Sequence, residues 1–140
     1  MPRKITRAVA RIETGFEETP YVGSLDAKRD WGYVKDYVVG MHQILQADQP
    51  DDFVLAMGES SVREFVELAL AEVGRSIEWR GEGVEETGIE TPVRIDPQYF
   101  RQTEVDLLIG DASKAHKRLG WKPTTNFADL ASKWSRPISQ

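Results

Sequence analysis

The 140-residue sequence predicts an α/β fold with about five helices and a few short strands. Apolar residues recur at helical spacing in several segments that end at glycine or proline, and short apolar or alternating runs lie between these segments. The composition, with 40% hydrophobic and 29% charged residues, is typical of a folded globular chain. We therefore interpret residues 1–140 as one domain of mixed fold, or as one substantial lobe of a larger domain.

The first expected element is a helix over residues 2–15, because Ile5 and Val9 lie on one face and Gly15 can end it. Arginine recurs every four residues along a second stripe of this helix: Arg3, Arg7 and Arg11. Such a stripe is usually a solvent-exposed helix face, and we interpret it so.

Further helices are expected over residues 34–47, 61–73, 111–119 and 126–134. The sequence SVRE at 61–64 is a capping box for the second of these. Short strands are expected over residues 21–25, 53–57, 76–80 and 93–95, and an acidic, glycine-rich loop over 81–92. Only the strand 53–57 is apolar enough to be buried on both faces, and such a strand needs partners. The sequence therefore predicts part of a larger sheet protein.

Several classes of function are excluded by the composition and the motifs. The absence of cysteine rules out disulfides and thiolate metal sites and suits a cytoplasmic protein. The net charge of −5 argues against nucleic-acid binding. No apolar run approaches the ~20 residues that a membrane span needs. Neither a dinucleotide-binding glycine fingerprint nor a P-loop nor a metal-binding histidine pair occurs, and no tyrosine has a lysine four residues on. We therefore assemble no catalytic set and expect no metal site.

The sequence LDAKRDWGYVKD, residues 25–36, surrounds two large aromatic side chains with charged ones. A turn accounts for part of this pattern, since Asp26 can accept hydrogen bonds from nearby backbone N–H groups and Gly32 relaxes the backbone. A turn needs neither the aromatic residues nor the adjacent arginine. The residues alone leave two interpretations open: a solvated corner, or a rim that binds an anion through Arg29.

Five segments together resemble one enzyme family: RKITRAVARI, VGSLDAKRDWGYVKDYV, SVREFVELALAEVG, DPQYFRQTEVDLLIGD and KAHKRLGWKP. They are similar, in the same order, to the C-terminal, substrate-binding part of the GDP-mannose 4,6-dehydratases, which belong to the extended short-chain dehydrogenase/reductases. The resemblance implies the α/β substrate-domain portion of that fold without its N-terminal Rossmann half. It also implies a lyase family that uses NADP to convert GDP-mannose into GDP-4-keto-6-deoxymannose in deoxysugar biosynthesis.

In that family the glycine fingerprint, the catalytic threonine and glutamate, and the tyrosine–lysine pair lie upstream of the matching segment. The resemblance therefore implies that these 140 residues bind no nicotinamide cofactor and do not catalyse alone, whether they are an excised segment or a naturally short gene. The expected role is to bind a GDP-sugar, with GDP-mannose or GDP as the ligand. The alternative is a structural or interaction fragment that has lost its ligand and assembles with itself or with a partner.

The resemblance carries the family's sugar-nucleotide contacts to four residues: Lys4, Arg29, Arg101 and Glu104. The three basic ones would hold the diphosphate, and arginine suits this role because its planar guanidinium binds two oxygens at once. Glu104 would accept hydrogen bonds from the ribose hydroxyls. Residues 31–33 would hold the Arg29 loop in place. Gln102 stands where the family usually has proline, beside Arg101.

The helix 34–47 and the strand 53–57 join the cofactor-binding half in the family. Without that cover, their large apolar side chains would be exposed to water, which is unfavourable. We therefore expect a homo-oligomer formed through this face, by pairing of the helices or of strand edges.

Overall fold

The structure is a computed structural model that describes residues 2–15, 19–100 and 109–135. Its helices are α1 (Pro2–Glu13), α2 (Val34–Leu45), α3 (Val62–Ala71), α4 (Ser113–Leu119) and α5 (Phe127–Ser135), with a short 3-10 helix η1 (Gly83–Glu85). The strands are β1 (Tyr21–Val22), β2 (Lys28–Asp30), β3 (Glu59–Ser61), β4 (Glu78–Arg80), β5 (Thr87–Ile89) and β6 (Arg94–Ile95). The predicted α/β class and the five expected helices are confirmed.

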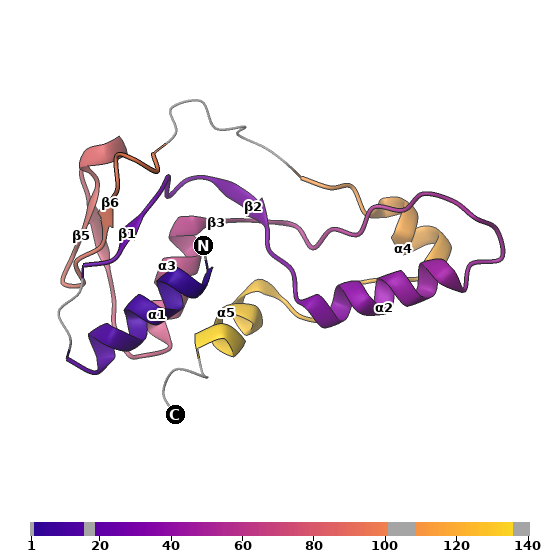
Figure 1. The fold of residues 1–140 in the computed structure, drawn as a ribbon, viewed down its shortest axis with the longest axis horizontal. Helices are drawn as coiled ribbons and strands as arrows, with labels where there is room; N and C mark the ends of the chain where they lie inside the picture. Colours follow the sequence, from indigo (N-terminus) through magenta and orange to yellow (C-terminus); the bar gives the residue numbers. More distant parts are fainter. Residues whose placement is uncertain (1, 16–18, 101–108, 136–140) are drawn as a thin grey trace.

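The molecule is elongated, with helices gathered at both ends (Figure 1). One end, the sheet lobe, consists of α1, α3, α5 and the strands β1, β4, β5 and β6. The other end, the α2–α4 lobe, consists of α2, α4 and the extended residues 51–58. The two-stranded ribbon of β2 and β3 lies between them (Figure 1).

The sheet lobe contains most of the hydrophobic core. Its strands are in the order β1-β6-β5-β4, where β1 and β6 run parallel and the other pairs antiparallel. Helices α1, α3 and α5 pack against one another. The core is formed by fully buried side chains such as Phe65, Leu70, Val22 and Ala131. At the start of α3 the predicted capping box is present, since Ser61 and the side chain of Glu64 bond each other's backbone N–H groups.

The α2–α4 lobe has a much smaller core, centred on Trp121, which is 1% exposed. The Trp121 indole N–H donates to the backbone carbonyl of Asp36 at 2.9 Å. The buried Asp36 carboxylate accepts from the Thr124 hydroxyl at 2.6 Å and from the Thr125 N–H at 3.1 Å. Burial opposes ionisation of this carboxyl, but the hydrogen bonds from Thr124 and Thr125 outweigh it and lower its pKa. These bonds tie α2 to the segment between α4 and α5.

The predicted central strand at residues 53–57 is wrong as a strand. In the described part of the chain these residues are extended but pair with no other strand. Ala56 is buried, whereas Val54 is 51% exposed. A strand exists only through its ladder of hydrogen bonds, and no neighbouring strand among the described residues completes one.

The strand boundaries differ from the expectations in three further places. The expected strands at 21–25, 76–80 and 93–95 are present but shorter, as β1, β4 and β6. The segment 81–92, expected as a loop, contains η1 and the strand β5. The ribbon of β2 and β3 was not predicted, because neither strand has an apolar or alternating pattern.

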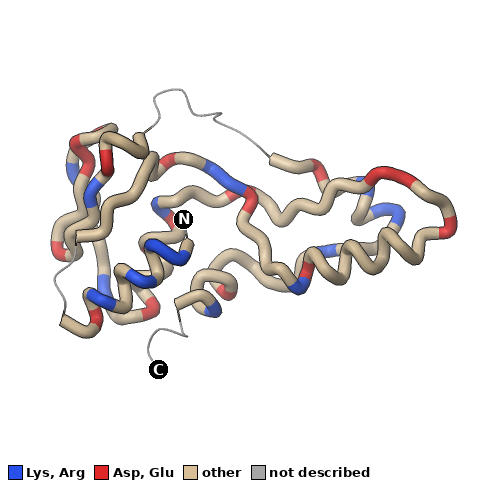
Figure 2. The backbone as a smooth tube through the Cα atoms, viewed as in Figure 1, with Lys and Arg blue, Asp and Glu red and all other residues tan. Residues whose placement is uncertain are grey.

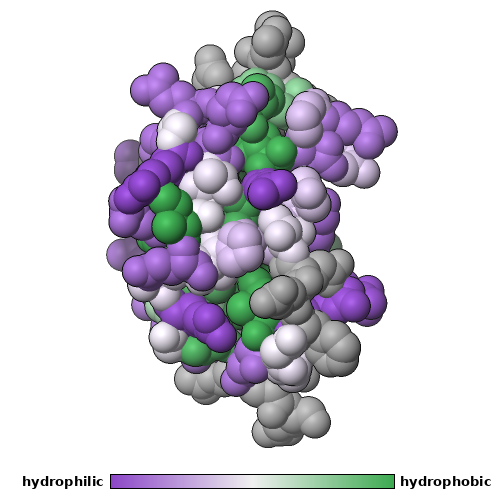
Figure 3. All heavy atoms as spheres, turned by 90° about the vertical axis from the view of Figure 1, so that its left-hand side faces the viewer, coloured by the Kyte–Doolittle hydropathy of each residue, from purple (hydrophilic) through white to green (hydrophobic). Residues whose placement is uncertain are grey.

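In the described ranges, no helix combines the length and the apolar character that a membrane crossing requires. At the sheet end of the molecule, hydrophilic residues cover most of the surface, and small hydrophobic areas lie between them (Figure 3).

Candidate functional site

Arg29 is held at the centre of the ribbon between the two lobes. In this ribbon Lys28 pairs with Ser61, Arg29 with Ser60 and Asp30 with Glu59. The Arg29 side chain is half-buried, and its Nη1 donates to the backbone carbonyl of Lys28 at 2.7 Å. Lys28 Nζ forms an ion pair with Glu59 across the ribbon at 2.9 Å. The guanidinium therefore lies on regular structure rather than on a free turn.

Trp31 anchors this ribbon to the core of the sheet lobe. Its indole N–H donates to the Ser60 carbonyl at 2.8 Å. Its ring stacks on Phe65 with centroids 5.2 Å apart and planes 6° apart. Phe127 and Trp134 surround the same ring. Trp31, two residues after Arg29, thus anchors the end of β2 to the core of the sheet lobe, which accounts for a large aromatic side chain beside the charged ones.

Asp30 and Gly32 connect the ribbon to the α2–α4 lobe. The Asp30 carboxylate accepts from the Met57 N–H at 2.9 Å and from the Tyr37 hydroxyl at 3.3 Å. Burial and the neighbouring Asp30 charge raise the pKa of Tyr37 to about 12. A Cβ atom at position 32 would overlap the Tyr37 ring, so any larger residue would have to displace that ring and its hydrogen bond to Asp30.

Asp26 has a different partner from the one expected at the turn. Its carboxylate accepts from Arg63 at 2.8 Å, and Arg63 also binds Glu86 at 2.6 Å. Asp26 remains largely exposed, at 79%, but it is tied to α3 through this ion pair. Hydrogen bonding to Glu86 and Asp26 raises the pKa of Arg63 despite its partial burial.

Lys4 lies in the first turn of α1 and is exposed. Its Nζ lies 5.0 Å from the centroid of the Tyr99 ring, a cation–π contact. Arg101 and Glu104 lie outside the described residues. The structure therefore places two of the four predicted site residues, one at the start of α1 and one on β2.

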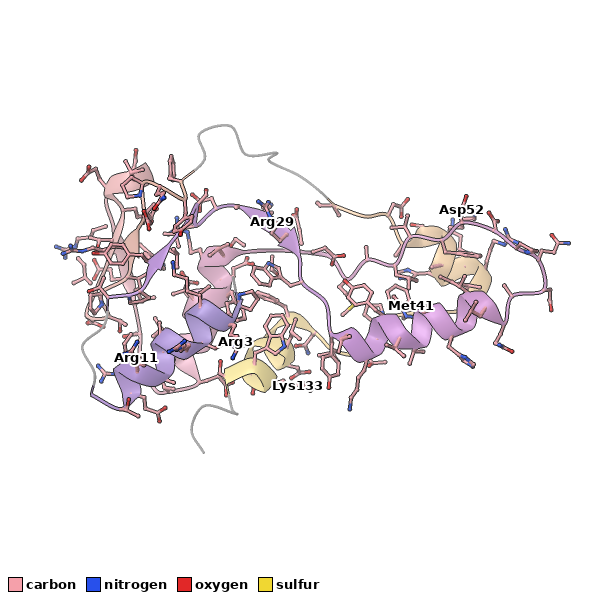
Figure 4. The ribbon with its side chains drawn as sticks, in the orientation of Figure 1. Arg3, Arg11, Arg29, Met41, Asp52 and Lys133 are labelled. Carbon is pink, nitrogen blue, oxygen red and sulfur yellow. The ribbon has the colours of Figure 1, made fainter. Side chains whose placement is uncertain are left out.

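A feature that the sequence did not reveal is a hollow along α1 of about 650 Å³. The arginine stripe is exposed, as expected, but it does not face bulk solvent over a flat surface. The hollow is lined by Arg3, Lys4, Arg7, Ala8, Arg11, Thr19, Pro20, Tyr21, Asp96 and Tyr99. Figure 4 shows Arg3 and Arg11 on α1 and Arg29 on the ribbon. The sequence signal was the repeat of arginine at every fourth position, with Lys4 one residue away.

Among the described residues, no group of three or more histidine, aspartate or glutamate side chains is placed to hold a metal ion. The buried and shifted acid Asp36 is bound by threonines and serves the fold. The described arginine and lysine side chains at these places can bind anions.

The family model of GDP-mannose 4,6 dehydratase matches residues 1–134. A GDP-mannose 4,6-dehydratase of Sinorhizobium fredii is 54% identical over 96% of this chain, and a human GDP-mannose 4,6 dehydratase is 48% identical over 91% of it. The chain belongs to the GDP-mannose 4,6-dehydratase family. It spans 40% of the bacterial relative and 36% of the human one.

Solved structures show the same fold in more distant proteins. The structure of RMD from Pseudomonas aeruginosa, complexed with NADPH, matches with a TM-score of 0.78 at 19% identity, covering 98% of this chain and 41% of that one. A UDP-glucose 4-epimerase from Bifidobacterium longum, in complex with NAD+ and UDP, matches with a TM-score of 0.66 at 22% identity, covering 97% and 41%. This chain therefore has the fold of part of an extended short-chain dehydrogenase/reductase, as the sequence predicted.

Proposed function

We propose that these residues form the GDP-sugar-binding part of a GDP-mannose 4,6-dehydratase and do not catalyse alone. The observation that carries the proposal is that the backbone around Arg29 is held in a fixed position. Its backbone pairs with β3, its neighbour Trp31 is stacked in the core, and Asp30 binds the other lobe. A preorganised guanidinium loses little conformational freedom when it binds an anion, so its position favours recognition of phosphate.

The other residues of the proposed GDP-binding site are taken from the family motifs. Lys4 supplies a second positive charge from the first turn of α1. Arg101 and Glu104 complete the proposed site, with Arg101 on the diphosphate and Glu104 on the ribose hydroxyls. The 140 residues contain no dinucleotide-binding glycine fingerprint and no tyrosine with a lysine four residues on. Binding of the nucleotide, rather than dehydration of the sugar, is therefore the activity that we assign to them.

Calorimetric titration with GDP tests this proposal. Charge-assisted hydrogen bonds contribute roughly 1.5–3 kcal/mol, so Arg29→Ala or Arg101→Ala should weaken GDP binding by about ten- to a hundredfold. The matched control is Arg75→Ala, which removes an exposed arginine just after α3. GDP and GDP-mannose should bind with similar affinity, and added salt should weaken both.

Two results would contradict the proposal. One is the absence of any GDP-dependent change in the amide resonances near Arg29 at millimolar concentration. The other is a loss of GDP affinity in Arg75→Ala as large as that in Arg29→Ala, because the affinity would then depend on the total charge of the protein and not on a specific site. Either result would leave the interaction-fragment alternative in its place.

One surface favours that second candidate, self-association through α2. Four apolar side chains on one side of this helix are more than half exposed: Val34, Val38, Met41 and Leu45. Figure 2 shows α2 without charged residues over most of its length. A second copy would cover this face by packing helix against helix. Burying the exposed half of each of these side chains would contribute about 1 kcal/mol, so the four side chains on two copies together contribute roughly 8 kcal/mol. The entropic cost of association is about 4–15 kcal/mol.

We therefore expect a weak dimer whose population rises with protein concentration. Light scattering over a concentration series measures it. Met41→Lys should shift the protein to monomer, whereas the control Gln46→Lys, at the end of the same helix, should leave the dimer intact. A wild-type protein that stays monomeric at the highest concentration would refute this surface as an interface.

The cytoplasmic location stays a prediction from composition.

A further inference from the structure

Asp30 lies at the end of the ribbon from which two segments lead into the α2–α4 lobe. Residues 31–33 connect β2 to α2, and only Gly58 stands between Met57 and the first residue of β3. Gly58 has a φ of 115°, a backbone conformation that favours glycine, so the chain turns directly after Met57. Figure 1 shows the ribbon between the two lobes. Asp30 therefore lies where the orientation of the ribbon relative to the α2–α4 lobe is set.

The Asp30 carboxylate bonds to both of these segments. Its Oδ1 accepts from the Met57 N–H at 2.9 Å, and its Oδ2 accepts from the hydroxyl of Tyr37 on α2 at 3.3 Å. Burial, and after it the charge of Asp30, raises the pKa of Tyr37 to about 12, so this hydroxyl remains a donor at neutral pH. The Tyr37 ring stacks on Trp121, with centroids 6.5 Å apart, at the core of the lobe. One carboxylate thus joins the ribbon to an extended segment and to this core.

Arg29 is affected by this bond through the backbone. Successive side chains of a strand point to opposite faces, so Arg29 and Asp30 face opposite sides of β2. Trp31 fixes the ribbon to the core of the sheet lobe, and Asp30 fixes it to the α2–α4 lobe. A guanidinium that binds two oxygens of an anion loses affinity when it is tilted or displaced, because its hydrogen bonds are directional. The orientation of the ribbon therefore decides how well Arg29 can bind an anion.

We propose that Asp30 and Tyr37 are positioning residues for anion binding at Arg29. This inference rests on the proposed function and gives the α2–α4 lobe a part in it. The hydrogen bond between the two residues holds the ribbon in one orientation, so that less conformational freedom is lost when the anion binds. Coupling between two such events is reciprocal. An anion bound at Arg29 should therefore tighten the bond between the Met57 N–H and Asp30.

The sign of one substitution separates positioning from a direct effect of charge. Asp30 is negative and next to Arg29, so its charge by itself opposes the binding of an anion there. Asp30→Ala should strengthen GDP binding if this charge dominates, and weaken it if positioning dominates. We expect GDP to bind about threefold more weakly, or weaker still, in calorimetry.

Tyr37→Phe is the main test, because it removes one hydroxyl and keeps the ring and every charge. GDP should bind to this variant about three- to tenfold more weakly, the effect of losing one hydrogen bond. The control is Thr124→Val, which removes a hydroxyl bonded to Asp36 in the same lobe. It should lose stability in urea unfolding and bind GDP as the wild type does. If Tyr37 served only the stability of the lobe, the two variants would have the same GDP affinity.

Hydrogen exchange of the Met57 amide is the second measurement. This amide lies in a segment without a strand partner among the described residues, so its protection reports on its bond to Asp30. GDP should slow its exchange in the wild type, and slow it less in Tyr37→Phe.

Three results would overturn the positioning role and leave the proposed function standing. They are wild-type GDP affinity in Tyr37→Phe, tighter GDP binding by a folded Asp30→Ala, and a Met57 exchange rate that bound GDP does not change. Failure of the wild-type protein to bind GDP would overturn both the proposed function and this inference.

Discussion

Replacing Asp36 by asparagine removes the charge that joins α2 to the segment after α4. The Asp36 carboxylate accepts from Thr124 at 2.6 Å and from Thr125 at 3.1 Å, and its side chain is buried. Asparagine keeps one acceptor oxygen and places an NH2 group where the second was. With its Oδ1 turned to the Thr125 N–H, the NH2 group faces the Thr124 hydroxyl, which must then turn to accept, so both hydrogen bonds lose their charge assistance.

The expected loss in the free energy of unfolding is about 1.5–3 kcal/mol, the contribution of one hydrogen bond to a charged group. Urea unfolding followed by circular dichroism measures this quantity. The indole N–H resonance of Trp121 reports on the same place, because that group donates to the Asp36 carbonyl at 2.9 Å. The matched control is Asp48→Asn, an exposed aspartate in the loop after α2. Surface substitutions usually change the free energy of unfolding by no more than about 0.5 kcal/mol. If the free energies of unfolding of Asp36→Asn and Asp48→Asn differ by less than that, the role assigned to Asp36 is refuted.

The pKa of Asp36 sets the sign of the pH dependence. Its pKa in the folded state lies below the usual carboxyl value of 3.8. The stabilisation from this group is therefore complete above that usual value and is lost as the pH falls through the lower, folded-state pKa. Stability should fall below about pH 4 in the wild type. The same acid loss should be smaller in Asp36→Asn, which has no carboxyl to protonate at this position.

Three further outcomes follow from the described contacts. Gly32→Ala should lower stability, since the added Cβ overlaps the Tyr37 ring, and a lower midpoint of thermal unfolding than that of the wild type would show this. Arg63→Met should cost about 3–5 kcal/mol, because it leaves the buried carboxylate of Glu86 without its partner; a change under 1 kcal/mol in urea unfolding would contradict the buried pair. No saturable binding of NADP is expected in calorimetry at micromolar concentration, because the sequence has no glycine fingerprint to hold the pyrophosphate.

The helices could be predicted from the sequence because their signals are local. The capping box at Ser61 and the spacing of apolar residues on α1 determine their elements without reference to distant parts of the chain. The strands were harder to predict, because a strand is defined by its partner. The ribbon of β2 and β3 joins residues about thirty positions apart, as in the pairing of Arg29 with Ser60, and its polar sequence carries no periodic signal.

The candidate site could be predicted in part. The motif around Arg29 pointed to an anion site, but its anchoring through Trp31 and Phe65 depends on packing that no short segment contains. The arginine stripe on α1 was interpreted as a plain surface, because periodicity says which residues share a face and not what lies opposite. The other lining residues of the hollow are residues 19–21 together with Asp96 and Tyr99, and the last two lie nearly a hundred positions from Arg3 in the sequence.

The two lobes differ in how far they can stabilise themselves. The sheet lobe has a continuous core and a four-stranded sheet, so its elements satisfy one another. Among the described residues, the α2–α4 lobe has few buried side chains around Trp121, an extended segment at 53–57 without a strand partner, and an apolar α2 face open to water. Its order depends on specific polar ties, above all those of Asp36 and of Asp51, which binds Lys114 at 2.6 Å and also Arg118. A lobe held by polar ties beneath an exposed apolar helix face depends on fewer apolar contacts than the sheet lobe, so we expect substitutions at Asp36 or Asp51 to loosen α2 before they disturb the sheet.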